Sequence, residues 1–343
     1  MINKLVDRRE YTVEETMLAL VGGAGPDWER REVGVPTAGP GQVLIKVHAA
    51  ALNRADLYML EGSYSPNTKT TNVFTAGLES AGVIVAVGEG VDSVKVGDRV
   101  AAAGLGAFAE YVLQDARHVI AVPAALTWID AAALPVGLAT EHDALVTQGG
   151  FTPGMNVLIV GATTAIGLIA VQMAKALGAS RVTATTTSEA KKTALTAAGA
   201  DVAIDTRSEN LAEAVLAATG GAGVDIVLDH VGGQLFADAF SATRVGGTVI
   251  NIGRLAGSQS NIDLNALAFR RLRVLGTTFS VRTPDELASV CAALKPEILP
   301  AVADGRIRPV VDRVFDFDDA VKAADYLRTN TAVGKVVLAV GAR

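Results

Sequence analysis

Short apolar runs alternate with helical patterns through the second half of the chain, and this rhythm constrains the fold more than any other feature. The runs are VLIV, RVTATT, VAI, VDIVLD and GTVINIG, and the helical patterns between them cover residues 166–177, 189–198, 210–219 and 234–243. Strands that are apolar throughout are typical of a parallel sheet covered by helices on both faces. We therefore predict a doubly wound α/β domain that begins near residue 131.

The first part of the chain has a different pattern. Between about residues 17 and 122, glycine separates short β-type segments such as QVLIKVHAAAL, SAGVIVAVGEGV and FAEYVLQ, which indicates a compact β-rich domain. A further β-run, RLRVLGTTF, ends the α/β region near residue 279. The helical stretch that follows and the closing strand GKVVLAV look like a return to the first domain. A length of 343 residues suits two such domains.

Composition limits the classes of partner. The formal net charge is −6, so the chain lacks the basic surface that binds nucleic acids or anionic membranes. No apolar run approaches the ~20 residues that span a bilayer, and the charged start MINKLVDRREYTVEE is unlike a signal peptide. We expect a cytoplasmic protein that binds small molecules. With one cysteine, Cys291, and four scattered histidines, we expect no close-spaced Cys/His metal cluster.

The stretch GATTAIG, residues 161–167, joins the first run of the α/β region to its helix. A glycine-rich turn in this setting presents backbone N–H groups and a positive helix end to a pyrophosphate. The G-x-G-x-x-G fingerprint aligns with residues 162–167, where only Gly167 is kept and Thr164 occupies the second glycine position. By itself, the turn is compatible with a dinucleotide site and equally with an ordinary strand-to-helix turn.

The segment TATTTSEAK, after the second run, favours the dinucleotide interpretation. An NAD-specific site usually has an acidic residue about 20 residues beyond the fingerprint, where it holds the ribose hydroxyls. Here Thr186 and Ser188 lie in a run of hydroxyls and Lys191 follows one turn later, a set that suits a 2′-phosphate. We therefore predict NADP rather than NAD. As an alternative, the hydroxyls only cap a helix and the lysine is a solvated charge.

Seven motifs follow one another along the chain from about residue 17. They are PGQVLIKVHAAALNRADLYMLEGSY, AGLESAGVIVAVGEGV, VGDRV, LPVGLAT, VLIVGATTAIGLIAVQMAKALGA, GVDIVLDHVGG and VGKVVLAV. With them the chain resembles the medium-chain dehydrogenase/reductase superfamily, in the zinc-free quinone oxidoreductase branch that includes zeta-crystallin. The resemblance implies a GroES-like catalytic domain at residues 1–137 and 279–343 and a Rossmann NADP-binding domain at 138–278. It also implies an active site in the cleft between them and a homodimer joined through an edge strand of the Rossmann sheet.

The same resemblance implies that this chain lacks the catalytic zinc of the superfamily's alcohol dehydrogenases. The ligand positions hold Asn53, Leu78 and, near the third, Val136, and neither an amide nor an aliphatic side chain replaces a thiolate or imidazole ligand. Without a Lewis acid, alcohol oxidation loses its main electrostatic term. Hydride addition to a quinone or an α,β-unsaturated carbonyl needs less help, because conjugation spreads the negative charge. We therefore expect NADPH-dependent reduction of such acceptors.

The stretch NRADLYMLEGSY resembles the active-site segment of that branch. The resemblance implies that Tyr58 and Tyr64 donate hydrogen bonds or protons and that Asn53 positions the substrate. It also implies that Thr140 lies beside the nicotinamide. Leu60 replaces an arginine that is common in this segment, which would alter substrate choice. Taken without the resemblance, the two tyrosines near a glycine would also fit as packing residues.

Two histidines lie at positions of interest. After Thr140 the usual Ala-Tyr pair is Glu141-His142, and this histidine would either relay a proton or bond to the backbone at the domain junction. His230 follows the run VDIVLD, and ligands collect at the carboxyl ends of such strands.

The family pattern also implies the cofactor contacts. Backbone groups of Ala165 and Ile166 would bind the pyrophosphate. The Cβ of Thr164 would crowd the pyrophosphate while its hydroxyl offers a hydrogen bond, so we expect retained but weakened NADPH binding. The other expected contacts are Thr186, Ser188 and Lys191 at the 2′-phosphate, Thr206 near the adenine, Gly253 and Arg254 after the fifth strand, and Phe279 and Lys335 around the nicotinamide.

Two other functions stay open. An enoyl-thioester reductase on the same fold would use a basic cleft rim, for which the candidates are Arg254, Arg270, Arg271, Arg273 and Arg282. A non-catalytic binding protein would have lost the cofactor through the altered turn. The ability to bind a dinucleotide separates this second alternative from both enzymes.

Overall fold

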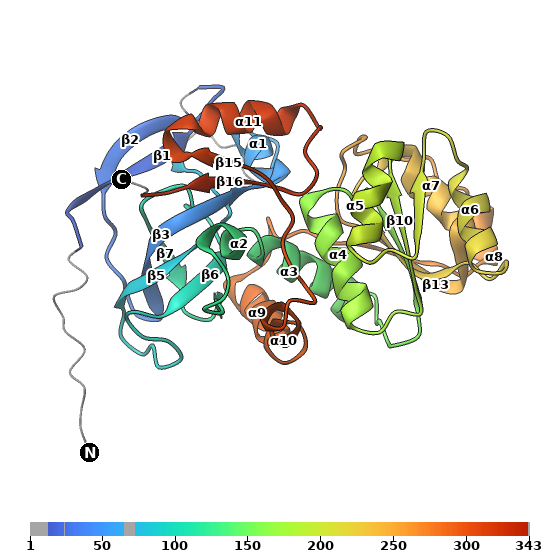
Figure 1. Cartoon of the computed structure of the whole chain (residues 1–343), viewed down its shortest axis with the longest axis horizontal. Helices are drawn as coiled ribbons and strands as arrows, with labels where there is room; N and C mark the ends of the chain where they lie inside the picture. Colours follow the sequence, from blue (N-terminus) through green and yellow to red (C-terminus); the bar gives the residue numbers. More distant parts are fainter. Residues whose placement is uncertain (1–12, 24, 65–72, 342–343) are drawn as a thin grey trace, which may run out of the picture.

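The computed structural model describes residues 13–23, 25–64 and 73–341. Its two largest sheets lie toward opposite ends of the long axis of the molecule (Figure 1). The helices between them are α3 (Pro135–His142), α9 (Pro284–Glu297) and α10 (Leu299–Ala303). Residues 1–12, which the sequence prediction places in the first domain, lie outside the described residues.

The first domain is β-rich and takes its strands from both ends of the chain. Its seven-stranded sheet contains β15 (Val311–Asp316), β16 (Lys335–Ala339), β3 (Gln42–Leu52), β5 (Glu79–Val87), β6 (Arg99–Ala103) and β8 (Val119–Ala121) in spatial order, with β7 (Tyr111–Asp115) paired to β3. A smaller sheet has the order β2 (Glu29–Gly34), β1 (Thr16–Gly22), β4 (Phe74–Thr75). Its helical segments are α1 (Arg54–Leu60), α2 (Trp128–Ala132), η3 (Phe317–Asp319) and α11 (Ala320–Arg328). The closing strand β16 pairs with β3, so the end of the chain lies in the same sheet as this early strand.

The second domain is a doubly wound Rossmann-type fold, as the alternation of runs predicts. Its six parallel strands have the spatial order β11 (Val202–Asp205), β10 (Arg181–Thr186), β9 (Asn156–Val160), β12 (Val224–Asp229), β13 (Thr243–Asn251), β14 (Arg273–Gly276). The connecting helical segments are α4 (Ala165–Ala176), η2 (Glu189–Lys191), α5 (Lys192–Ala197), α6 (Leu211–Ala218), α7 (Gly233–Ala242) and α8 (Leu264–Phe269). This order reverses beside β9, where such folds bind ligands.

The structure differs from the expected element boundaries in a few places. Thr243 was expected to end a helix but begins β13, because its backbone is already extended (φ −92°, ψ 136°) directly after α7. The sequence patterns did not predict α8, β15 or α11. The domain boundary expected between residues 137 and 138 lies inside α3, which continues into the π-helical segment η1 (Asp143–Gln148). The two domains are therefore joined by a continuous helical connection at this point.

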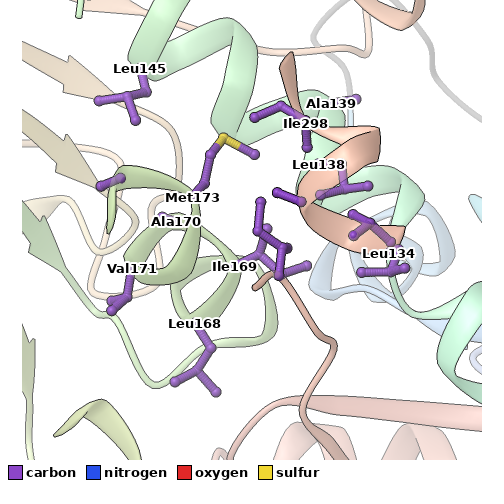
Figure 2. Close-up of a cluster of buried hydrophobic side chains, with 14 of the residues drawn as sticks. Leu134, Leu138, Ala139, Leu145, Leu168, Ile169, Ala170, Val171, Met173 and Ile298 are labelled. Carbon is purple, nitrogen blue, oxygen red and sulfur yellow. The ribbon is translucent and has the colours of Figure 1, made fainter. Parts of the chain in front are cut away.

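Helices α3 and α4 pack closely against each other between the two sheets. Figure 2 shows Leu138 and Ala139 of α3 in one apolar cluster with Ile169 and Met173 of α4 and with Ile298. These side chains are almost completely buried. Gly137 on α3 permits this close approach, because an added Cβ at this position would lie only 2.4 Å from the Ile169 Cδ1. The packing sets the position of α3, and therefore of Thr140, relative to the strand-to-helix turn before α4.

Candidate functional site

A cavity of about 1570 Å³ lies between the domains, along the carboxyl ends of the strands of the parallel sheet. Pockets for drug-sized ligands usually measure roughly 300–1,000 Å³. The larger volume therefore leaves room for a dinucleotide together with a second small molecule.

The turn between β9 and α4 keeps the backbone of a nucleotide-binding turn although two of the three fingerprint glycines are absent. Gly161 has φ +76°, and an added Cβ would lie 2.6 Å from the Val231 Cγ2. Any other residue would therefore be strained at this position. At Gly167 an added Cβ would lie 2.7 Å from the Ala162 Cα, so this glycine lets α4 pack closely on β9. The fingerprint alignment identified Gly167 but missed Gly161, whose positive φ became visible only in the structure.

Thr164 caps α4 and uses both hydrogen-bonding functions of its hydroxyl in doing so. Its Oγ1 accepts from the Gly167 N–H at 3.1 Å and donates to the Gly161 carbonyl at 3.0 Å. The N–H groups of Ala165 and Ile166 line the cavity region and have no acceptor among the described residues, as expected in the first turn of a helix. These two donors at the positive end of α4 fit a pyrophosphate. The additional donor expected from Thr164 is unavailable unless the bond to Gly161 breaks.

The segment after β10 adds hydroxyl and ammonium groups to the cavity. Thr186 is buried and lines the cavity, and its Oγ1 has no hydrogen-bond partner among the described residues. Lys191 lines the cavity too, and its Nζ donates to the Thr331 carbonyl at 3.0 Å, across the domain boundary. Ser188 is not a lining residue, whereas Thr187 is. The contact expected from Ser188 therefore stays a prediction.

The remaining residues expected to contact the cofactor come from several elements and line the same cavity. Gly253 requires the absence of a side chain, because an added Cβ would lie 2.3 Å from the His230 carbonyl oxygen. The full set of these lining residues is Thr140, Thr206, Gly253, Arg254, Phe279 and Lys335. Together with the turn, they fit a dinucleotide that lies across the carboxyl edge of the sheet.

The first-domain wall of the cavity carries the two expected tyrosines. Tyr58 lies on α1, and Tyr64 follows that helix; both line the cavity. Burial and the negative charge of Asp56 raise the pKa of Tyr64 to about 12, so this phenol keeps its proton at neutral pH. Tyr64 is therefore available as a hydrogen-bond donor.

A buried network of three polar side chains lies beside the tyrosines. The Nζ of Lys335 is 2.5 Å from Glu79 Oε1 and donates to Asn53 Oδ1 at 2.7 Å. The Nδ2 of Asn53 donates to the same Glu79 oxygen at 2.9 Å, and the other carboxylate oxygen accepts from the Val136 N–H at 2.9 Å. Glu79 has no exposed surface and Lys335 is 2% exposed. Buried charges need such partners, and this pair has them.

Glu79 also connects the three positions that the sequence resemblance aligns with the zinc ligands of alcohol dehydrogenases. It follows Leu78 in the chain and accepts from the Asn53 side chain and the Val136 backbone. Asn53, Leu78 and Val136 all line the cavity. No three His, Cys, Asp or Glu side chains gather as a metal-binding group within residues 13–23, 25–64 and 73–341.

Comparisons with known proteins agree with this two-domain fold. Family models described as "Alcohol dehydrogenase GroES-like domain" and "Zinc-binding dehydrogenase" match residues 39–124 and 165–295. The chain is 32% identical over 319 residues to a 2-methylene-furan-3-one reductase from Solanum lycopersicum, covering 89% of this chain and 74% of that protein. The chain belongs to the medium-chain dehydrogenase/reductase superfamily.

Within this superfamily, the relatives include a quinone oxidoreductase from Sus scrofa, 30% identical over 90% of this chain and 92% of that protein. A mycobacterial member solved in complex with NADPH has a TM-score of 0.82 and 31% identity, and the match covers 94% of this chain and 99% of the other. This medium-chain dehydrogenase/reductase is thus an oxidoreductase with the fold of a nicotinamide-dependent enzyme. Among the residues that the structure describes, no helix has the length and apolar character needed to cross a membrane.

The two histidines of this medium-chain dehydrogenase/reductase have different surroundings, and His142 fits neither the proton relay nor the backbone bond considered from the sequence. His142 is buried and bonds to Glu297 Oε2 at 3.0 Å, and it does not line the cavity. His230 lines the cavity, with Nε2 2.8 Å from Glu141 Oε1 and Nδ1 2.9 Å from the Val160 carbonyl. Burial alone would lower the pKa of His230, but the Glu141 carboxylate, the Val160 carbonyl and the charge of Asp229 together raise the pKa above its ordinary value. The residue pair that replaces Ala-Tyr thus contributes an acidic partner for a histidine 89 positions away.

Proposed function

We propose that this protein is an NADPH-dependent, zinc-free reductase of quinones or α,β-unsaturated carbonyl compounds. The observation that carries the proposal is a single cavity that joins a dinucleotide-type turn to two tyrosines and a buried lysine. The 2-methylene-furan-3-one reductase and the quinone oxidoreductase, as relatives, support this class of acceptor.

Residues of this chain would hold the cofactor through the backbone N–H groups of Ala165 and Ile166 at the pyrophosphate. Thr186 and Lys191 would hold the 2′-phosphate. When bound, the reduced nicotinamide supplies a hydride. The NADPH complex of the mycobacterial relative supports this choice of cofactor.

The first-domain wall of the cavity would bind the acceptor and supply the proton that completes its reduction. Tyr64, protonated at neutral pH, donates a hydrogen bond or a proton to the reduced acceptor, and Tyr58 lies on the same wall. Leu78 and Val136 exclude water from the acceptor on the side where zinc-dependent members carry ligands. The amide and aliphatic side chains at these positions support zinc independence, because they lack the usual donor atoms of a zinc site.

A screen of NADPH oxidation across quinones, enones and enoyl thioesters tests the function. We expect turnover with at least one quinone or enone and no stoichiometric zinc by metal analysis of the same sample. Replacing both Tyr58 and Tyr64 by Phe should lower kcat/KM for every accepted compound. Unchanged kcat/KM in this double variant contradicts the tyrosine roles, and failure to bind any dinucleotide would favour a non-catalytic binding protein.

An NADPH preference over NADH predicts a specific role for Lys191. Replacing it by Met should raise the Kd for NADPH at least about tenfold, which corresponds to ~1.4 kcal/mol, and leave the Kd for NADH unchanged. Lys192 is the matched control, because Glu189 and Glu209 already bind its Nζ. Fluorescence titration of both cofactors against both variants measures this. Equal effects of the two substitutions on NADPH binding contradict the assignment.

The structure gives limited support to an enoyl-thioester substrate. Of the five candidate rim arginines, only Arg254 and Arg282 line the cavity. Arg282 forms an ion pair with Asp143 at 2.5 Å, so its charge is already matched. The thioester arm of the screen decides between the two enzyme functions.

We also propose a homodimer that forms through β14. This strand ends the six-stranded sheet and pairs only with β13 among the described residues. The exposed apolar side chains Val274 on β14 and Phe269 just before it are 40% and 81% exposed. An uncovered edge strand with apolar neighbours favours pairing with a second copy.

A further inference from the structure

The ion pair between Lys335 and Glu79 is arranged asymmetrically with respect to the cavity. Lys335 and Asn53 line the cavity, whereas Glu79 does not. The Asn53 amide and the Val136 N–H hold the carboxylate of Glu79, which is not a lining residue. Of the two charged residues, the lysine is therefore the one that borders the cavity.

One hydrogen of the ammonium group is not used by this network. A lysine ammonium has three N–H donors, and those of Lys335 are directed to Glu79 Oε1 and Asn53 Oδ1. The apolar side chains of Leu78 and Val136 line the same part of the active-site wall. In such a poorly solvated setting, a charged donor stabilises a developing negative charge more strongly than it does in water.

We propose that Lys335 is a catalytic residue that binds the oxygen on which negative charge develops in the acceptor. It would take the electrostatic role of the metal at the position where zinc-dependent members of the superfamily place their ligands. The inference rests on the proposed function and adds a role distinct from the nicotinamide contact expected for Lys335. Asn53 and Glu79 are positioning residues that hold the ammonium at the cavity wall.

The chemistry balances without a further reactant. Hydride adds to the β-carbon of the enone, the C=C electron pair shifts toward the carbonyl, and the oxygen becomes an enolate that accepts the third N–H of Lys335. A proton from Tyr64 or from solvent then restores a neutral, saturated carbonyl compound. A quinone gains one hydride to give the hydroquinone monoanion, whose oxygen accepts the Lys335 N–H. One proton from Tyr64 or from solvent then completes the hydroquinone.

A phenol titration tests the oxyanion site without turnover. 4-Nitrophenol resembles the reduced monoanion of a quinone, and its ionisation is visible by absorbance. The wild-type protein should favour the bound phenolate and lower the apparent pKa of the bound phenol, and Lys335→Met should bind phenolate at least tenfold more weakly. Lys46→Met, which removes a lysine outside the cavity lining, is the matched control. Equal phenolate binding by wild type and Lys335→Met, or no phenolate binding by wild type, overturns the proposal.

Acceptor choice provides the second measurement. Lys335→Met should lower kcat/KM for a weak acceptor such as cyclohex-2-enone by about 10²–10³-fold, the usual effect of losing one oxyanion donor, and by much less for an electron-poor quinone. Lys335→Arg should recover part of the loss, and an NADPH titration should show that each variant still folds and binds cofactor. Equal losses for both acceptors contradict the role. If wild type reduces no quinone or enone, the proposed function fails, while the phenol titration still decides whether Lys335 binds an oxyanion.

Discussion

Thr164 shows how one residue changes the meaning of a motif. The fingerprint treats it as a lost glycine, but in the structure its hydroxyl caps α4 through the Gly167 N–H and the Gly161 carbonyl. The residue thus stabilises the helix while its Cβ occupies the place where the backbone should approach a pyrophosphate most closely.

Substitutions at Thr164 should separate these two effects. Thr164→Ala should lower the free energy of unfolding by about 1 kcal/mol, because the cap is lost. Thr164→Gly should tighten NADPH binding by up to about tenfold, or ~1.4 kcal/mol, because the Cβ is removed. Thr164→Ser keeps the hydroxyl and the Cβ and should match wild type in both. Calorimetric NADPH titrations and urea unfolding measure the two quantities, and equal affinity of the Gly and Ser variants rules out a steric penalty.

Asp56 gives a pH dependence whose sign follows from its burial. Burial, and next the charge of Glu79, raise the pKa of Asp56 from 3.8 to about 8, against the opposing bond from the Asn53 N–H. Between these values the folded state keeps a proton that the unfolded state has released. The contribution of Asp56 to stability is therefore present below about pH 4 and is lost progressively as the pH rises toward 8.

The variant Asp56→Asn should remove this contribution. We expect its free energy of unfolding to fall less than that of wild type between pH 5 and pH 8, because Asn keeps an oxygen for the Asn53 N–H but carries no proton to release. Urea unfolding of both proteins at several pH values measures the difference. Parallel pH profiles would show that Asp56 ionises normally in the folded state.

At the scale of elements, the contact between α3 and α4 links the site to the core. The α4 helix begins at the cofactor turn, α3 carries Thr140, and Ile169 packs at their contact. Ile169→Ala should lower the free energy of unfolding by roughly 2–5 kcal/mol, because a buried side chain leaves a cavity. Val321→Ala on α11, where the valine is 38% exposed, is the matched control and should stay within about 0.5 kcal/mol of wild type. Similar losses of stability in both variants would contradict the importance of this contact.

At the scale of the whole molecule, the edge strand β14 determines the expected assembly. Val274→Lys should convert the proposed dimer into a monomer, because a charge on an edge strand opposes pairing with a second strand. Val314→Lys on β15, an exposed valine on an edge strand of the seven-stranded sheet, is the matched control and should leave the mass of the assembly unchanged. Analytical ultracentrifugation measures both masses. A wild-type monomer at micromolar concentration, or a dimeric Val274→Lys, contradicts the assembly through β14.

Much of the molecule was predictable because local pattern is sufficient for local structure. Apolar runs such as VLIV and VDIVLD became buried parallel strands, and the helical patterns between them became α4, α6 and α7 with small shifts of their ends. The positions of Thr186 and Lys191 beside a dinucleotide turn also follow from sequence, because short connections keep neighbouring segments at one edge of the sheet. The motifs placed Tyr58 and Tyr64 at the cavity as well.

Only the tertiary structure decided which polar and charged groups meet. Lys335 reaches the Asn53 amide across 282 positions, and His230 reaches Glu141 across 89. No periodicity links such residues, because their pairing depends on how the chain ends and the two domains pack and on which partners replace water around a buried charge. The sequence by itself therefore determined the strands, the helices and the cofactor edge, whereas packing between domains decided the electrostatics of the site.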